Sequence, residues 1–189
     1  MIYDLAGSFI HMFGNFNNLI QFTIQIYNDV DLERTIIFVS DEHNHRIMKF
    51  DSDGNFLKQW GTRGKKINEF NKPKGIYVSN DKKLYVCDYS NHRIQVFDLD
   101  GNFEKIFAPG NFIYPSNITI SAIGEVYICD GDIPSDDPAE CACRLQVFDQ
   151  LGQRIKIVDI HDNSTYYTNN YVDLAYSYAN RENNVIIMG

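Results

Sequence analysis

Short runs of alternating apolar and polar residues fill the chain, and these runs are rich in β-branched and aromatic residues. This is the pattern of half-buried β-strands, whereas no segment shows a convincing helical period. Short polar connections separate the runs: Asn80-Asp81 suits a hairpin loop, and Asp98-Leu-Asp-Gly101 suits a turn that glycine closes. The pattern therefore predicts four strands in one stretch, at residues 76–79, 83–87, 93–97 and 103–107.

The same pattern occurs several times along the chain. A turn of the form Asp-x-x-Gly places its glycine at positions 7, 54, 101 and 152, with spacings of 47, 47 and 51 residues. Four antiparallel strands in a repeat of about 40–50 residues are typical of a β-propeller blade, so we predict an all-β propeller of such blades. The recurring positions, which we interpret as architecture, are Asp41, Asp88 and Asp130, Asn44 and Asn91, Arg46, Arg93 and Arg144, and Gly54, Gly101 and Gly152.

Three stretches of the second repeat carry a resemblance to a known family. They are Pro-Lys-Gly-Ile-Tyr-Val at 73–78, Leu-Tyr-Val-Cys-Asp at 84–88 and Asn-His-Arg-Ile-Gln-Val-Phe-Asp at 91–98. In this the chain resembles the NHL-repeat family. The resemblance implies a β-propeller, usually of six blades, that often serves as the substrate-recognition part of larger proteins, including RING-type ubiquitin ligases. Nothing in this sequence supplies the ligase module.

The chain holds about four blades' worth of strands. We expect one domain, 1–189, with blades at about 20–60, 73–107 and 115–157, and with 1–14 and 171–189 as complementary halves of a further blade. Because the family normally uses six blades, two explanations stay open. The chain is a fragment of a larger, partial propeller, or it closes as a small ring by itself or through self-association.

Composition narrows the class of function. The chain has 25 acidic and 17 basic residues, a net charge of −8, which favours solubility and argues mildly against nucleic-acid or anionic-membrane surfaces. No run of about 18 apolar residues predicts a membrane span. The start of the sequence lacks the pattern of a signal peptide, and the four cysteines are interpreted as free thiols, so we expect a cytoplasmic protein.

The recurring aspartates are the first candidates for chemistry. Asp41, Asp88 and Asp130 end successive second strands, where carboxylates of propeller enzymes bind a divalent cation. The favoured interpretation is structural: each accepts hydrogen bonds within its own hairpin, for example Asp88 from Asn91 and Arg93. His45, His92 and Cys143 also share one repeat position, but equivalent positions on neighbouring blades diverge too far for one metal.

Two loops depart from the repeat and are the candidate binding segments. Residues 61–74 hold five basic residues and one acid, and residues 131–143 form an acidic insert. Long loops on a rigid scaffold often carry function. The partner-binding candidates are Arg63, Lys65, Lys66, Lys72 and Lys74 on the first, and Asp132, Asp136, Asp137 and Glu140 on the second. Asp136, Cys141 and Cys143 are only weak metal candidates, because one Cys-x-Cys pair lacks the second ligand pair of a zinc site.

Three functions follow, in order of preference. The first is a non-catalytic scaffold that binds a protein partner through its loop-bearing face and uses no cofactor. The second is an NHL propeller that binds single-stranded RNA, since some members of the family do so with bases and stacking aromatics. The third is a metal-dependent six-bladed enzyme of the amidating-lyase or lactonase type. It is disfavoured because the expected ligands are missing from the predicted first strands at 76–79 and 117–120.

Overall fold

The computed structural model describes residues 2–3, 9–11, 22–29, 34–131 and 144–159. Within these ranges the chain is built from β-strands, with one short 3₁₀ turn, η1 (Tyr89–Asn91). None of the described residues forms a helix with the length and hydropathy of a membrane span. The all-β class predicted from the alternating pattern is confirmed.

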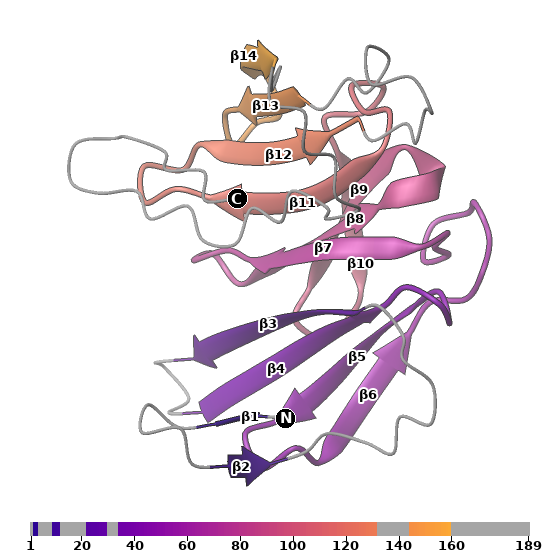
Figure 1. Cartoon of the computed structure of the whole chain (residues 1–189), viewed down its shortest axis with the longest axis vertical. Coiled ribbons are helices and arrows are strands. Elements are labelled where there is room, and N and C mark those ends of the chain that lie inside the picture. Colours follow the sequence, from indigo (N-terminus) through magenta and orange to yellow (C-terminus); the bar gives the residue numbers. More distant parts are fainter. Residues whose placement is uncertain (1, 4–8, 12–21, 30–33, 132–143, 160–189) are drawn as a thin grey trace, which may run out of the picture.

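Three four-stranded antiparallel sheets follow one another along the chain (Figure 1). In each sheet the strands lie in sequence order, so that neighbours in the sheet are also consecutive along the chain. This is the meander of a propeller blade. Blade 1 consists of β3 (Phe22–Asp29), β4 (Arg34–Asp41), β5 (Arg46–Asp51) and β6 (Phe56–Trp60). Blade 2 consists of β7 (Pro73–Val78), β8 (Lys83–Asp88), β9 (Arg93–Asp98) and β10 (Phe103–Phe107). Blade 3 consists of β11 (Pro115–Ile120), β12 (Val126–Asp130), β13 (Arg144–Phe148) and β14 (Arg154–Asp159).

The strands predicted for blade 2 are present, with one clear difference at the first strand. We predicted residues 76–79, whereas β7 begins at Pro73 and ends at Val78. The pairing of β7 with β8 shifts between Pro73 and Ile76, which marks a bulge that alternation alone does not reveal. The predicted turn is also present: the N–H of Gly101 donates to the carbonyl of Asp98 at 3.1 Å, and Gly101 has φ 79°.

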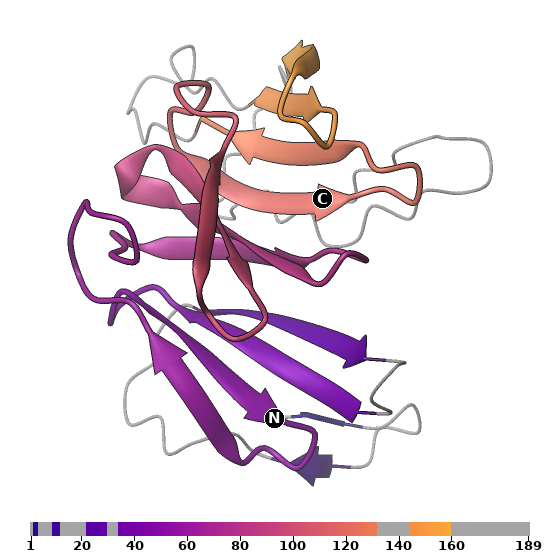
Figure 2. The ribbon, with the colours of Figure 1, turned by 180° about the vertical axis from the view of Figure 1, so that it is seen from behind.

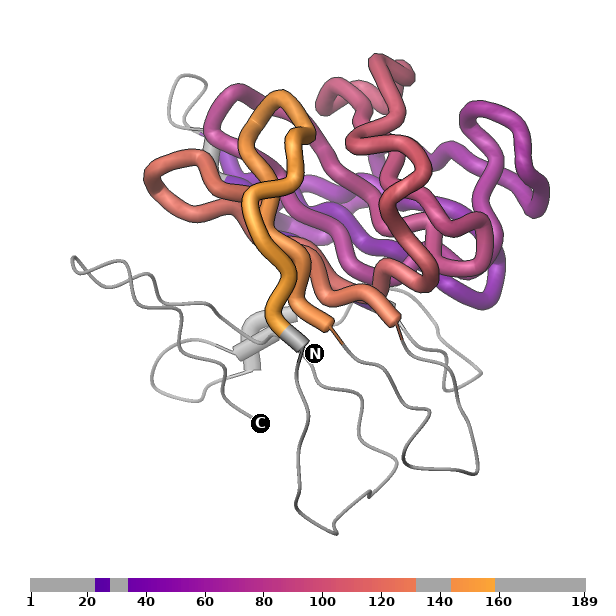
Figure 3. Tube along the Cα trace, turned by 90° about the horizontal axis from the view of Figure 1, so that it is seen from above, coloured from indigo at the N-terminus to yellow at the C-terminus, as the bar shows by residue number. Residues whose placement is uncertain are grey.

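The blades pack face to face through two apolar cores. Between blades 1 and 2 lie Phe38, Ile47, Phe70 and Phe97, together with Trp60 at the edge. Between blades 2 and 3, the core contains the buried residues Cys87, Ile94, Phe107, Ile128 and Phe148. Figure 2 shows the three sheets one above another, with the β13–β14 hairpin at the top of the row, and Figure 3 shows the same row from above. Burial of these side chains is the main favourable term that holds the row together.

The row of sheets does not close into a ring within the described residues. Near the start of the chain, β1 (Ile2–Tyr3) pairs with β2 (Phe9–His11) as an antiparallel hairpin, in line with the two strands expected in 1–14. The proposed complementary half at 171–189 lies outside the described residues. The two explanations, a partial propeller and a small closed ring, therefore both stay open, and the assignment of the whole chain to one domain stays a prediction.

Candidate functional site

The recurring aspartates lie at the ends of the second strands, β4, β8 and β12, at one end of each blade. Asp41, Asp88 and Asp130 are 3%, 0% and 1% exposed. A buried carboxylate is costly unless charged and polar groups neutralise it. Their partners therefore decide whether these groups can act on a ligand.

Asp88 is saturated by groups of its own blade and of the loop before it. Arg93 Nε donates to Asp88 Oδ2 at 2.7 Å, and Asn91 Nδ2 donates to both carboxylate oxygens at 3.0 and 2.9 Å. Gln95 Nε2 donates to Oδ2 at 3.1 Å, and the N–H of Asn71 to Oδ1 at 2.7 Å. The predicted hydrogen bonds from Asn91 and Arg93 are thus present. With five donor contacts, Asp88 has no accessible oxygen left for a cation.

Asp130 has an equivalent set of partners. Arg144 donates through Nη2 at 2.7 Å and Nε at 3.1 Å, and Gln146 Nε2 donates at 2.7 Å. The N–H groups of Ile113 and Tyr114 both donate to Oδ1 at 2.8 Å. We call each such group of an aspartate, an arginine and a glutamine an Asp–Arg–Gln node.

Blade 1 has a related arrangement without the glutamine. Asp41 accepts from Arg46 Nε at 2.9 Å and from the side chain and N–H of Asn44. Met48 occupies the repeat position of Gln95. No cluster of three or more His, Cys, Asp or Glu side chains suited to a metal ion occurs in the described part of the chain.

The node of blade 2 also holds the loop that precedes the blade, residues 61–72, which we call the basic loop. Arg93 donates to three of its carbonyl groups: Nη1 to Lys65 O at 2.8 Å, and Nη2 to Lys66 O at 2.7 Å and Glu69 O at 2.9 Å. Gln95 Nε2 also donates to Glu69 O, at 2.8 Å. One partly buried arginine and one buried glutamine therefore fix the path of the loop backbone.

Further contacts complete the attachment of the basic loop. Asn91 Nδ2 donates to Gly64 O at 2.7 Å, and the N–H of Asn68 donates to Gln95 Oε1 at 3.2 Å. Within the loop, the N–H of Phe70 donates to Thr62 O at 2.9 Å. Phe70 itself is fully buried between blades 1 and 2. The loop is therefore an ordered platform although it is twelve residues long.

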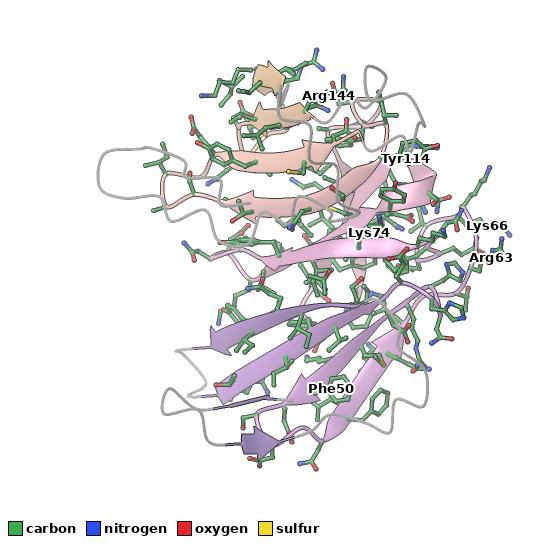
Figure 4. All side chains as sticks on the ribbon, in the orientation of Figure 1. Phe50, Arg63, Lys66, Lys74, Tyr114 and Arg144 are labelled. Carbon is green, nitrogen blue, oxygen red and sulfur yellow. The ribbon has the colours of Figure 1, made fainter. Side chains whose placement is uncertain are left out.

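Because the node binds the carbonyl groups, the cationic side chains of the basic loop face outward. Arg63, Lys65, Lys66 and Lys72 are exposed, and Figure 4 shows Arg63 and Lys66 extending from the edge of the molecule. Lys74, which we grouped with them, lies on β7 instead, and its Nζ is 3.6 Å from the centroid of the Tyr89 ring. The structure thus brings together four of the five predicted bases as exposed groups.

Three rings form a cluster beside the basic loop. Tyr89 and Tyr114 have centroids 5.1 Å apart, and His92 lies edge-on to Tyr114 at 4.7 Å. His92 Nδ1 also bonds the carbonyl of Ile113. The sequence did not reveal this cluster, because Tyr89 and Tyr114 are far apart in the chain and only the packing of blade 3 on blade 2 makes them neighbours.

The two histidines of the repeat serve the loops rather than a shared site. His45 Nδ1 accepts from the N–H of Lys72 at 3.0 Å, so that this imidazole supports the end of the basic loop. Burial lowers the pKa of His45, and the positive charges of Arg63, His43 and Lys72 lower it further, against the opposing effect of Asp41. Both effects favour the neutral imidazole, which is the form that can accept this hydrogen bond.

The glutamines of the nodes are the residues that sequence reasoning missed. Gln95 and Gln146 are fully buried, although they stand inside the apolar runs Ile-Gln-Val-Phe and Leu-Gln-Val-Phe. A buried amide needs hydrogen-bonding partners, so this repeated polar interruption was the available signal.

The acidic candidates Asp132, Asp136, Asp137 and Glu140, with Cys141 and Cys143, lie outside the described residues. The other two cysteines, Cys87 and Cys129, are buried among apolar side chains. Burial raises the pKa of the Cys87 thiol well above its ordinary value, so the thiol stays protonated.

The family model of the NHL repeat matches residues 70–97, which include the Asp88 node. The resemblance predicted from the sequence is thus confirmed for this repeat. A search of curated protein sequences returns no match.

Several solved structures share the fold. The region shared with a protein of Bacteroides fragilis covers 77% of this chain and 38% of that protein, at 17% identity and a TM-score of 0.57. The region shared with a protein of unknown function from Bacteroides caccae covers 72% of this chain and 48% of that protein, at 11% identity and a TM-score of 0.54. The region shared with the hydrazine synthase of Kuenenia stuttgartiensis covers 67% of this chain and 33% of that protein, at 19% identity and a TM-score of 0.51. These likenesses concern the fold alone, and the chain spans less than half the length of each of these structures.

Proposed function

From the premise that this chain carries an NHL repeat within a row of propeller blades, we propose that it is a non-catalytic scaffold that binds a protein partner. The binding surface is the basic loop together with the neighbouring ring cluster. The observation that carries this proposal is the contrast in blade 2 between the charged groups of the node and those of the basic loop. In the node, the buried Asp88 carboxylate and the partly buried Arg93 guanidinium neutralise one another, whereas the bases of the loop are exposed on a fixed backbone.

A fixed loop is suited to binding. When the backbone is already ordered, association does not carry the entropic cost of ordering it. A catalytic role would need a reactive group with access to substrate. The described aspartates at this face are instead buried and hydrogen-bonded on all sides.

The proposal can be tested by site-specific photo-crosslinking in an extract of the source cells. One variant carries a photoreactive residue at Lys66 on the basic loop, and its matched control carries it at exposed Asn80 in the β7–β8 hairpin loop. We expect a defined protein adduct from position 66, reduced at least tenfold by the added change Lys65→Glu, and no such adduct from position 80. Equal labelling from both positions would contradict binding at the loop.

Two further measurements decide between this function and its alternatives. Stoichiometric zinc or calcium in the purified protein would contradict a purely non-catalytic scaffold. An RNA adduct at position 66, together with an affinity for RNA that falls steeply with salt, would replace the protein partner by single-stranded RNA.

A further inference from the structure

A small hollow opens between the basic loop and η1. Its volume is about 130 Å³, and it is lined by Lys65, Ser90, Asn91, His92 and Arg93. One wall is Lys65 of the basic loop, and the other is formed by residues 90–93. Arg93 joins the two walls, because its Nη1 donates to Lys65 O. The hollow is therefore held in shape by the same hydrogen bonds that order the loop.

The positive charge of the lining comes from Lys65, because Asp88 neutralises Arg93, and no carboxylate is part of the lining. The nearest recurring carboxylate, Asp88, is fully buried and bound by Arg93, Asn91 and Gln95. Lys65 carries an ammonium group and Ser90 a hydroxyl group, and both can donate to an anion. The chemistry of the hollow thus suits one carboxylate group, and the exposed Lys66 and Arg63 extend the positive surface beyond it.

Two exposed isoleucines flank this positive surface. Ile67 on the basic loop is 54% exposed, and Ile113 on the loop before blade 3 is 42% exposed. Apolar side chains beside cations match a peptide in which acidic and apolar residues alternate. A polynucleotide backbone offers polar sugars and phosphates rather than aliphatic side chains to place on them.

The ring cluster also argues against a nucleic acid at this surface. Base stacking needs an open aromatic face. Here Lys74 covers Tyr89, and Tyr114 is engaged by both Tyr89 and His92. The net charge of −8 leaves only the local bases to attract phosphates.

We propose that the hollow binds a carboxylate side chain of an acidic peptide segment, with a neighbouring apolar side chain of the peptide on Ile67 or Ile113. This inference rests on the proposed function and specifies the chemistry of the partner. It makes the Lys65 ammonium and the Ser90 hydroxyl the specificity-determining groups, and it makes the basic loop a preformed half of the interface.

The test uses the full chain and two fluorescent peptides. The first is acetyl-Gly-Glu-Ile-Glu-Ile-Glu-Gly-amide, and the second has glutamine in place of each glutamate. We expect binding of the first in fluorescence anisotropy, with an affinity at least tenfold higher than that of the second. Lys65→Glu is expected to reduce this affinity tenfold or more, and Ser90→Asp to do the same by placing a carboxylate in the hollow itself.

The matched control is Lys156→Glu, which makes the same charge change at an exposed lysine on β14. It should leave the affinity within about twofold. Equal affinity for both peptides, or an equal loss in Lys156→Glu, would overturn the proposal, and so would tighter binding of a twelve-nucleotide single-stranded RNA that competes with the peptide. Thermal midpoints of all variants identify any that fail to fold. If the adduct at position 66 persists but the acidic peptide does not bind, this inference fails while the proposed function stands.

Discussion

Blades 2 and 3 contain the same buried node but hold different loops with it. In blade 2, Asp88, Arg93 and Gln95 fix a twelve-residue loop that carries four exposed bases. In blade 3, the equivalent node fixes residues 108–114, which contain no base, through Asn111 O and the N–H groups of Ile113 and Tyr114. The node is thus constant architecture, and the loop that it holds is the variable part. Specific function is therefore expected in the loop.

The largest expected effect is removal of the carboxylate from either node. Asp88→Ala leaves Arg93, which is mostly buried, without its partner, and Asp130→Ala does the same to Arg144. Each change should lower the free energy of unfolding by about 3–5 kcal/mol, because an uncompensated buried charge is costly. Chemical denaturation measures both. Similar losses would show that the two nodes are equivalent. The control is Asp53→Ala at an exposed turn position, which should change the free energy of unfolding by less than about 0.5 kcal/mol.

The next largest loss of stability is expected from replacing the node glutamines, and it should differ between the two nodes. Gln95→Met copies the residue that blade 1 has at this position, and it removes the bonds to Glu69 O and Asn68 N as well as to Asp88. Buried polar groups left without partners should lower stability by about 1–3 kcal/mol. Gln146→Met removes fewer bonds to its loop and should cost less. A larger loss at Gln146 would contradict the view that the longer loop depends more on its glutamine.

The contacts of the nodes differ in how far the sequence predicts them. The contacts of the aspartate with asparagine and arginine were predictable in blades 1 and 2, because the arginine follows the aspartate by 5 residues in both. Gln95 was visible only as a polar residue inside an apolar run. The Tyr89–Tyr114 contact was not predictable, since it depends on how one blade packs on the next. The bulge in β7 was also missed, because a bulge breaks the alternation from which strands are inferred.

A smaller effect depends on pH. His45 has a lowered pKa in the folded protein, so below its ordinary value of 6.5 the unfolded chain takes up this proton more readily. The stability that His45 contributes is present above pH 6.5 and is lost as the pH falls below that value. His45→Asn removes the titration and suits the left-handed backbone, φ 56°, at this position. Denaturation midpoints at pH 7.5 and 5.5 should fall more in the wild type than in the variant, and equal falls would contradict this role.

The smallest effect on stability is expected at the exposed bases. Lys65→Glu and Lys66→Glu should each change the free energy of unfolding by less than about 0.5 kcal/mol, because no ion pair of either side chain occurs among the described residues. A loss of more than 1 kcal/mol in chemical denaturation would show that these lysines belong to the architecture rather than to a binding surface.

We infer above all that the node of blade 2 fixes the basic loop before any partner binds. Amide hydrogen exchange tests this directly at Phe70, Asn68 and Asn71, whose N–H groups donate to Thr62 O, Gln95 Oε1 and Asp88 Oδ1. We expect slow exchange of all three amides in the wild type. In Gln95→Met, Asn68 should become fast while the amides of β8 stay slow. Exchange of these three amides at the rate of an unstructured chain in the wild type would contradict this inference.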